Sequence, residues 1–223
     1  MIISANQGTY KFVETDSILA VIERTLTDQG LNWDRVTKEH GKLHTYRLPD
    51  IRINDGKSDM VGQIYFKNSE TPGTALSLYI GAYRFICANG LIVGVGEGGR
   101  LIHRVGPTAD QFLVGLVTMV ETSVDSLRYE LQNTIDENIN TPVVSPLSII
   151  GNLPIQKSVK DSLFTRYFTG TLRDDITNVW GLYNNINELV RKHSRSASGA
   201  AYKDIGLLEH IKILNENSVD LVA

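Results

Sequence analysis

Hydrophobic residues recur at helical spacing near the start of the chain. Within residues 16–29, apolar side chains stand three and four positions apart from Ile18 to Leu26. This spacing places them on one face of an amphipathic helix. Gly30 follows, and glycine readily takes the left-handed conformation that ends many helices. The pattern therefore predicts a helix over residues 16–29.

The pattern then changes to short strand-like segments between turn signals. The Asp-Gly pair at 55–56 is typical of a hairpin, and the Pro-Gly pair at 72–73 marks a further turn. The glycine-rich segment 96–99 is predicted to close another hairpin. The predicted strands are 43–48, which ends before Pro49, then 61–67, 75–88, 91–95 and 100–105. Strands that follow one another this closely predict an antiparallel meander.

The strand predicted over 75–88 has two different faces. Side chains alternate along a strand, so the even-numbered positions from Leu76 onward share one mainly apolar face. Arg84 lies on this same face. Tyr79 and Tyr83 lie on the other face. The alternation by itself does not decide which of the two faces is buried.

A long apolar stripe follows the predicted sheet. Thr108 and Gln111 match a capping box, and apolar residues at helical spacing continue to about residue 137. One helix of this length would be roughly 45 Å long. Residues 139–154 contain three prolines and are predicted to be a linker. Three further helices are predicted at 155–168, 174–192 and 204–214, with a mobile loop at 193–203.

These elements predict an α+β fold. An antiparallel meander sheet is expected to be flanked by the N-terminal helix and by the long amphipathic helix. We divide the chain into a core domain of residues 1–138 and a helical C-terminal extension of residues 139–223. The 223 residues suffice for one domain with such an extension.

The composition favours a soluble cytoplasmic protein without a membrane segment. The chain has no apolar run long enough for a membrane-spanning helix, and its first residues do not resemble a signal peptide. Its single cysteine, Cys87, cannot form an internal disulfide. The net charge is −3, yet residues 35–104 hold ten basic and six acidic side chains. The basic excess therefore lies in the strand-rich middle of the chain.

No pattern in the chain is diagnostic of catalysis. The glycines at 94–99 satisfy G-x-G-x-x-G, but a dinucleotide site needs a helix directly afterwards, and strand-like residues follow here. The chain has no P-loop, no G-x-S-x-G serine motif and no helical zinc motif. We therefore expect no enzyme activity, no catalytic residue, no cofactor and no metal. Asp174 and Asp175 are interpreted as favourable charges at a helix start.

Basic and aromatic residues gather on the predicted strands and after the predicted helix 174–192. Proteins that bind single-stranded nucleic acid stack bases on aromatics and hold phosphates with arginine. In the alternative interpretation, the aromatics pack in the core, and the cations face water or favour a helix end. The candidate nucleic-acid-binding residues are Lys67, Tyr79, Tyr83, Arg84, Arg100, His103, Arg104, Arg191, Lys192, Arg195 and Lys203.

Two short strings carry a family resemblance. Residues 84–91 read R-x-x-C-x-N-G-L and precede a basic and histidine-containing patch at 100–104, and residues 180–184 read W-x-x-x-N. Over roughly residues 70–215 the chain resembles a domain of unknown function that is common in phages and plasmids, often labelled phage/plasmid-like protein. The family has no assigned activity. The resemblance implies a mobile-element protein that works in a bacterial cytoplasm.

The predicted order of helix, antiparallel strands and long helix is similar to phage single-strand annealing proteins of the RecT and Red-beta kind. Those proteins hold nucleic acid along a basic groove and assemble into rings or filaments. The resemblance implies a phage-type homo-oligomer that binds single-stranded DNA in annealing or recombination. The alternative is an interaction protein that binds and modulates a host protein through an acidic helical surface.

Overall fold

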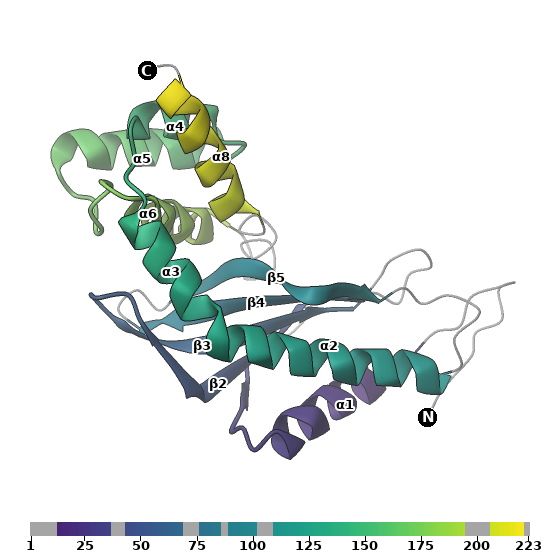
Figure 1. Ribbon diagram of the computed structural model, residues 1–223. Helices are drawn as coiled ribbons and strands as arrows, with labels where there is room; N and C mark the ends of the chain where they lie inside the picture. The colour runs from purple at the N-terminus through teal and green to yellow at the C-terminus, as the bar shows by residue number, and fades with distance from the viewer. Residues whose placement is uncertain are drawn as a thin grey trace, which may run out of the picture. The chain divides into compact units, whose positions relative to one another are not determined.

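The computed structural model describes residues 13–36, 43–68, 76–85, 89–101, 109–194 and 206–220. It confirms the predicted α+β class, with a five-stranded antiparallel sheet and helices before and after it (Figure 1). No helix of the described ranges is long and apolar enough to cross a membrane.

The sheet is a meander whose strands neighbour one another in chain order, as predicted. The first pair is antiparallel, and Asp34 lies opposite Arg47. The strands are β1 (Asp34–Arg35), β2 (Leu43–Asn54), β3 (Asp59–Lys67), β4 (Leu76–Arg84) and β5 (Asn89–Leu101). The predicted Asp-Gly turn joins β2 to β3, and Gly56 there has a φ of +79°, which glycine adopts without a Cβ clash.

The prediction that a strand ends before Pro49 is wrong, because β2 continues through this residue to Asn54. Proline cannot donate a hydrogen bond to a neighbouring strand. The two residues of β1 pair with Tyr46 and Arg47 and do not reach Pro49. Beyond that pair, the backbone amide of Asn32 donates to the Asp50 carboxylate at 2.7 Å. Because β1 ends before it reaches Pro49, β2 needs no amide donor toward β1 at this position, and a proline is tolerated there.

The hairpin predicted across residues 96–99 is also wrong, because β5 runs through these glycines as one strand of 13 residues. Glycine permits a chain reversal, but it also adopts extended backbone angles. Local composition could not distinguish these two outcomes. In the folded chain these residues belong to β5, which is the neighbour of β4 in the sheet.

Helices account for most of the remaining described residues. They are α1 (Thr15–Asp28), α2 (Ala109–Tyr129), α3 (Leu131–Asn140), α4 (Pro146–Asn152), α5 (Lys157–Thr169), α6 (Val179–Lys192) and α8 (Leu207–Asp220). Helix α4 lies inside the segment predicted to be a linker, because Pro146 occupies the first turn of the helix, where its missing amide is tolerated. Helix α6 begins at Val179, five residues after the predicted start at 174.

The single long helix predicted up to residue 137 is two helices, α2 and α3, which meet at Glu130. Leu127 and Leu131 are both buried, so the apolar stripe continues across the junction. However, Leu127 belongs to one compact unit of the chain and Leu131 to another. Each helix packs in the core of its own unit. The spacing of apolar residues does not show that the two halves of the stripe belong to different cores.

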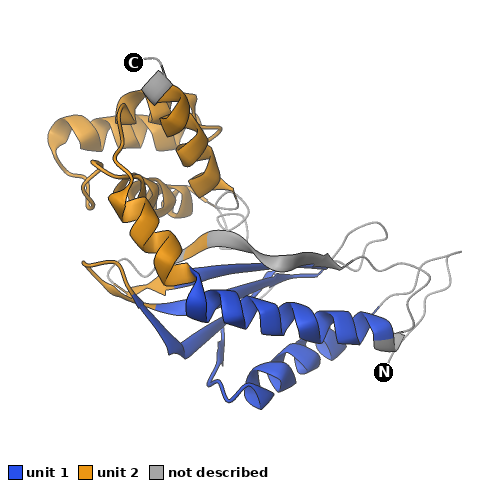
Figure 2. Ribbon diagram, in the orientation of Figure 1, with its two compact units in different colours: residues 1–53, 61–82, 94–130 blue, residues 54–60, 83–93, 131–223 orange. Residues whose placement is uncertain are grey.

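The contacts divide the chain into two compact units (Figure 2). Unit 1 comprises residues 1–53, 61–82 and 94–130. Unit 2 comprises residues 54–60, 83–93 and 131–223. The predicted C-terminal extension thus lies in unit 2, together with the β2–β3 turn and the segment around the end of β4.

Unit 1 has its core between the sheet and helices α1 and α2, which lie side by side (Figure 1). A Cβ added to Gly62 of β3 would lie 3.7 Å from the Leu127 side chain of α2. Helix α2 therefore packs closely over the sheet at this glycine. On β4, Leu76 and Leu78 are buried while Tyr79 is half-buried, so the even-numbered face is the inner one.

Unit 2 has its core among the helices. Helix α6 is the central element, because it packs against α3, α5 and α8. Every residue of α6 from Val179 to Val190 is buried. An isolated antiparallel bridge between Pro142 and Asn178 ties the chain after α3 to the start of α6.

Candidate functional site

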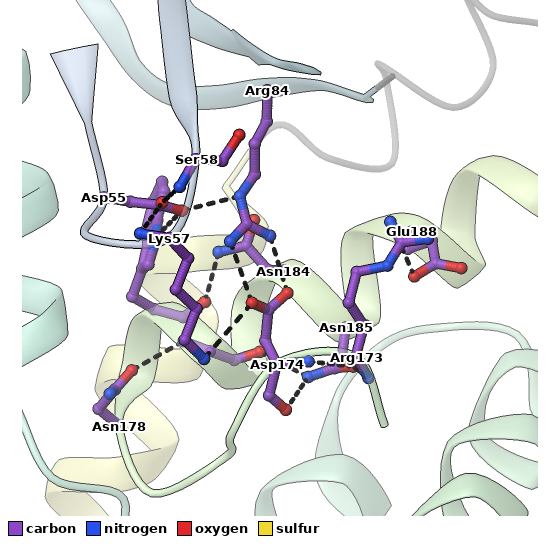
Figure 3. Close-up of polar contacts among 12 residues, drawn as sticks. Asp55, Lys57, Ser58, Arg84, Arg173, Asp174, Asn178, Asn184, Asn185 and Glu188 are labelled. Atoms are coloured by element: carbon purple, nitrogen blue, oxygen red, sulfur yellow. Dashed lines mark hydrogen bonds and ion pairs between the residues drawn. The ribbon is translucent and has the colours of Figure 1, made fainter. Parts of the chain in front are cut away.

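Arg84, the last residue of β4, is buried in unit 2 and forms ion pairs with two aspartates (Figure 3). Its Nε lies 2.7 Å from Oδ2 of Asp55, and its side chain is only 1% exposed. Its Nη1 and Nη2 donate to the two carboxylate oxygens of Asp174 at 2.8 and 3.0 Å. The planar guanidinium thus uses both of its edges, in the bidentate geometry that carboxylates favour.

The charges of this cluster nearly balance. A buried charge is costly unless opposite charges and hydrogen bonds compensate for its lost hydration. Two carboxylates face one guanidinium, and a second positive charge comes from Lys57, whose Nζ lies 3.7 Å from Asp174. Lys57 is more than half exposed, whereas Asp174 is 5% exposed. The cluster is therefore buried on its acidic side and reaches solvent through a lysine.

The β2–β3 turn holds Asp55 in place. One carboxylate oxygen of Asp55 accepts the backbone amide of Ser58 at 2.8 Å and that of Lys57 at 3.1 Å. Its other oxygen accepts the indole N–H of Trp180 at 3.1 Å. Asp55 therefore joins the turn, the end of β4 and the first turn of α6.

The loop before α6 holds Asp174, and the side chains of α6 fix this loop. The amide group of Asn185 accepts from the backbone N–H of Arg173 at 3.0 Å and donates to the backbone oxygen of Asp174 at 2.8 Å. Asn178 caps the helix by accepting from the amide of Gly181. The interpretation of Asp174 as a charge at a helix start is therefore wrong, because its carboxylate binds Arg84 and the helix begins at Val179.

A second charged cluster surrounds Glu188 on α6. Its side chain is 6% exposed and pairs with Arg166 of α5 at 3.4 Å, Arg173 at 3.5 Å and Lys192 one turn later. Burial raises the pKa of Glu188, but the hydrogen bond from Lys192 and the nearby positive charges outweigh this effect and lower the pKa below its ordinary value. Glu188 is therefore ionised, and three cationic side chains surround it.

This lowered pKa predicts how stability depends on pH. A carboxyl with a depressed folded-state pKa stabilises the fold above its ordinary pKa of 4.5, and this contribution is lost as the pH falls through the lower value. We expect Glu188→Gln to lower the free energy of unfolding at pH 7, with a difference from wild type that shrinks below pH 4.5. Urea denaturation at a series of pH values measures this difference.

Glu137→Gln provides the control, because Glu137 is 63% exposed and its ion pair is with Lys212. Exposed pairs contribute little, so this change should have a small effect at every pH. A Glu188→Gln effect that stayed constant from neutral to strongly acidic pH would contradict the prediction.

An aromatic pair with one exposed ring lies near the end of α5, the helix that carries Arg166. Phe168 is 75% exposed. Tyr167 contacts it edge to face, with ring centroids 5.3 Å apart. The helix ends at Thr169, and the next residue, Gly170, caps it with a φ of +65°. Single exposed apolar side chains are common on protein surfaces, but an aromatic ring with this exposure is accessible for stacking.

The predicted site residues fall into three groups. His103, Arg104, Arg195 and Lys203 lie outside the described residues, and only the backbone of Arg100, in β5, is described. Lys67 and Tyr79 are half-buried residues of unit 1. Tyr83, Arg84, Arg191 and Lys192 belong to unit 2. Tyr83 is half-buried and packs edge to face on Phe85, with ring centroids 5.3 Å apart.

Arg84 requires a correction. It was predicted to be one of the nucleic-acid-binding residues, but it lies on the buried face of β4 and its guanidinium is held by two carboxylates. Its charge is therefore not accessible to a phosphate. Arg191 is half-buried and donates from Nε to Asn187 at 3.3 Å, whereas Lys192 is 56% exposed.

The sequence prediction missed the partners of Arg84. Asp55 was interpreted only as a turn residue, although its carboxylate joins Arg84 to Trp180. Arg84 and Trp180 are the first residues of the strings R-x-x-C-x-N-G-L and W-x-x-x-N, and both bind Asp55. A usable signal existed: an arginine on an otherwise apolar strand face indicates a buried charge, and such a charge needs acidic partners.

Within the described part of the chain, no group of three His, Cys, Asp or Glu side chains could hold a metal ion. The two charged clusters of unit 2 can do different things. The Arg84 cluster ties together three segments that are distant in sequence. The Glu188 cluster presents cationic side chains to solvent around a buried carboxylate and can therefore attract anions.

Residues 3–212 match a family model described as "Domain of unknown function (DUF932)". No curated protein and no solved structure matches the chain.

Proposed function

The chain belongs to the DUF932 family of domains of unknown function, and we propose from the side chains of unit 2 that it binds single-stranded nucleic acid without catalysing a reaction. The resemblance to a phage and plasmid family supports this proposal, since it implies a mobile-element protein in a bacterial cytoplasm. Annealing or recombination of single strands is the role that fits such a protein best.

The observation that carries the proposal is the excess of positive charge around Glu188. Three cationic side chains, Arg166, Arg173 and Lys192, surround one buried carboxylate. One of the three charges is balanced by Glu188, and Arg173 and Lys192 are the more exposed members of the group. Phosphate contacts need basic side chains that reach solvent and require no particular base. This surface meets that requirement.

The aromatic pair on α5 supports single strands over duplexes. Phe168 exposes three quarters of its surface at the end of the helix that carries Arg166. Unpaired bases can stack on such a ring, whereas the bases of a duplex are already stacked on each other. Aromatic side chains combined with cationic side chains are typical of proteins that bind single strands. Lys67, Tyr79 and Tyr83 stay candidates for further contacts.

A binding titration tests the proposal. Fluorescence anisotropy of a labelled oligothymidylate is measured against protein concentration at several salt concentrations. We expect binding that weakens with salt, because bound phosphates release counterions. The double variant Arg173→Gln with Lys192→Gln should bind more weakly and reduce the slope of log K against log salt by about 1.4, or 0.7 for each lost contact.

Phe168→Ala should act differently from the charge variants. Losing one stacked base costs about 1–3 kcal/mol, which is about a 5- to 150-fold loss of affinity, with an unchanged salt slope. Ile213→Ala is the matched control, because Ile213 is an exposed apolar side chain elsewhere in unit 2. Lys157→Gln is the control for charge, since Lys157 is an exposed lysine that pairs with Asp161.

Two outcomes would count against nucleic-acid binding. One is the absence of binding at micromolar protein, and the other is binding that does not depend on salt. Equal affinity for a duplex of the same length would argue against the role of Phe168. Failure of all of these expectations would favour the alternative, a protein that acts on a host protein.

A further inference from the structure

An apolar groove lies between α1 and α2 in unit 1. It has a volume of about 380 Å³. Val21 of α1 and Leu113, Val114 and Val117 of α2 form its apolar lining, while Arg24 and Glu121 stand among its charged residues. The groove is open to solvent, so these apolar side chains stay partly exposed in the single chain.

The apolar surface in the groove exceeds what the core of unit 1 requires. Helix α2 already buries Leu116, Val120 and Val124 completely. Leu113 and Val117 form a second apolar row beside these residues and are only half-buried. Val114 is 65% exposed. An apolar ridge next to an apolar hollow is favourable once a complementary surface covers both.

We propose that a second copy of this chain covers the groove, so that two copies pair through their α1–α2 faces. In a two-fold pair each surface meets itself, and α1 of one copy lies against α2 of the other. Val114 of each copy then enters the groove of the second copy. The proposal concerns unit 1 and is independent of nucleic-acid binding by unit 2.

The groove holds one cationic side chain, Arg24, and two acidic ones, Asp28 and Glu121, so a two-fold pair can place an acidic side chain against each Arg24. Arg24 lies on α1 and Glu121 on α2. In the two-fold pair, Arg24 of one copy faces Glu121 of the second copy, and the contact occurs twice. Arg24 is available for it, because its side chain is 82% exposed and its pair with Asp28 is long, at 3.5 Å. An exposed pair of this kind is worth little and is easily exchanged.

The size of the groove limits the affinity. Nine side chains line it, whereas a standard protein–protein interface has about 20–30 residues on each side. We therefore expect a reversible dimer that dissociates in the micromolar range and not an obligate one. Sedimentation velocity of the full chain without nucleic acid, from about 1 µM to about 300 µM, covers this range.

The wild-type chain should shift with concentration from its 24.8 kDa monomer toward twice that mass. Val114→Asp should stay monomeric over the whole range, because it places a charge in the apolar contact. Val114 is exposed in the monomer, so circular dichroism should show an unchanged fold. Ile213→Asp, at an exposed apolar position in unit 2, is the matched control and should dimerise like the wild type.

A charge exchange tests the two-fold arrangement itself. Arg24→Glu and Glu121→Arg should each weaken the dimer about tenfold or more, and the double variant should restore most of the affinity. A wild-type chain that stays monomeric at the highest concentration overturns the proposal. A dimer that survives Val114→Asp, or a double variant no better than the single variants, overturns it equally.

Discussion

Replacing Arg84 with alanine is expected to lower the free energy of unfolding of unit 2 by about 3–5 kcal/mol. The guanidinium forms ion pairs with Asp55 and Asp174, and all three side chains are at most 5% exposed. Without Arg84 the two carboxylates stay buried with no cation between them. An uncompensated buried charge is among the most costly defects that a single substitution can create.

The fluorescence of Trp180 measures this effect directly, because its indole N–H donates to Asp55. The chain has two tryptophans, so the experiment uses a Trp33→Phe background in which only Trp180 emits. Urea denaturation then reports on unit 2 alone, which avoids assuming that both units unfold together. Lys157→Ala is the control, since it removes an ion pair whose lysine is exposed, and it should cost less than about 1 kcal/mol.

A compensating variant separates the loss of charge balance from the loss of packing. Arg84→Met combined with Asp55→Asn and Asp174→Asn leaves no buried charge in the cluster. Neutral replacements of buried ion pairs are often as stable as the pairs themselves, so this variant should be clearly more stable than Arg84→Ala. An Arg84→Ala chain within about 1 kcal/mol of the wild type would contradict the assignment of this cluster.

Gly181→Ala is expected to destabilise unit 2 by about 3 kcal/mol or more, although it adds a single methyl group. A Cβ at Gly181 would lie 1.7 Å from the backbone oxygen of Asp175 and 2.9 Å from its carbonyl carbon. Both atoms belong to the backbone, so no side-chain rotation can relieve the clash. The loop before α6 would have to move, and this loop carries Asp174, the bidentate partner of Arg84.

Gly151→Ala is the matched control for this change. Gly151 lies in α4, and a Cβ at this position would meet nothing within 4 Å. Alanine is favoured over glycine in a helix by about 1 kcal/mol, so this variant should be as stable as the wild type or slightly more stable. If both alanine variants unfolded at the wild-type urea concentration, the close approach at Gly181 would be refuted.

The parts of the fold that could be predicted have local causes. Helix α1 follows from apolar residues at helical spacing ended by Gly30, whose φ is +70°. The β2–β3 turn follows from the Asp-Gly pair at 55–56, and the meander from the close succession of strands. In each case a few consecutive residues contain the whole signal.

The parts that could not be predicted depend on competition between distant segments. The glycines at 96–99 permit a turn, but they lie inside β5 beside a neighbouring strand. The stripe across Glu130 fits one helix, but its two halves belong to different compact units. Periodicity records which face of an element is apolar, not which core that face joins.

The candidate site shows the same limit. The sequence by itself placed Arg84 on the apolar face of a strand and marked Trp180 as the start of a second string. It could not show that both bind Asp55, which is 125 positions before Trp180, or that Asp174, 90 positions after Arg84, completes the cluster. Local propensity determines helices, strands and turns, whereas a buried charge is satisfied only by side chains that the tertiary fold brings to it.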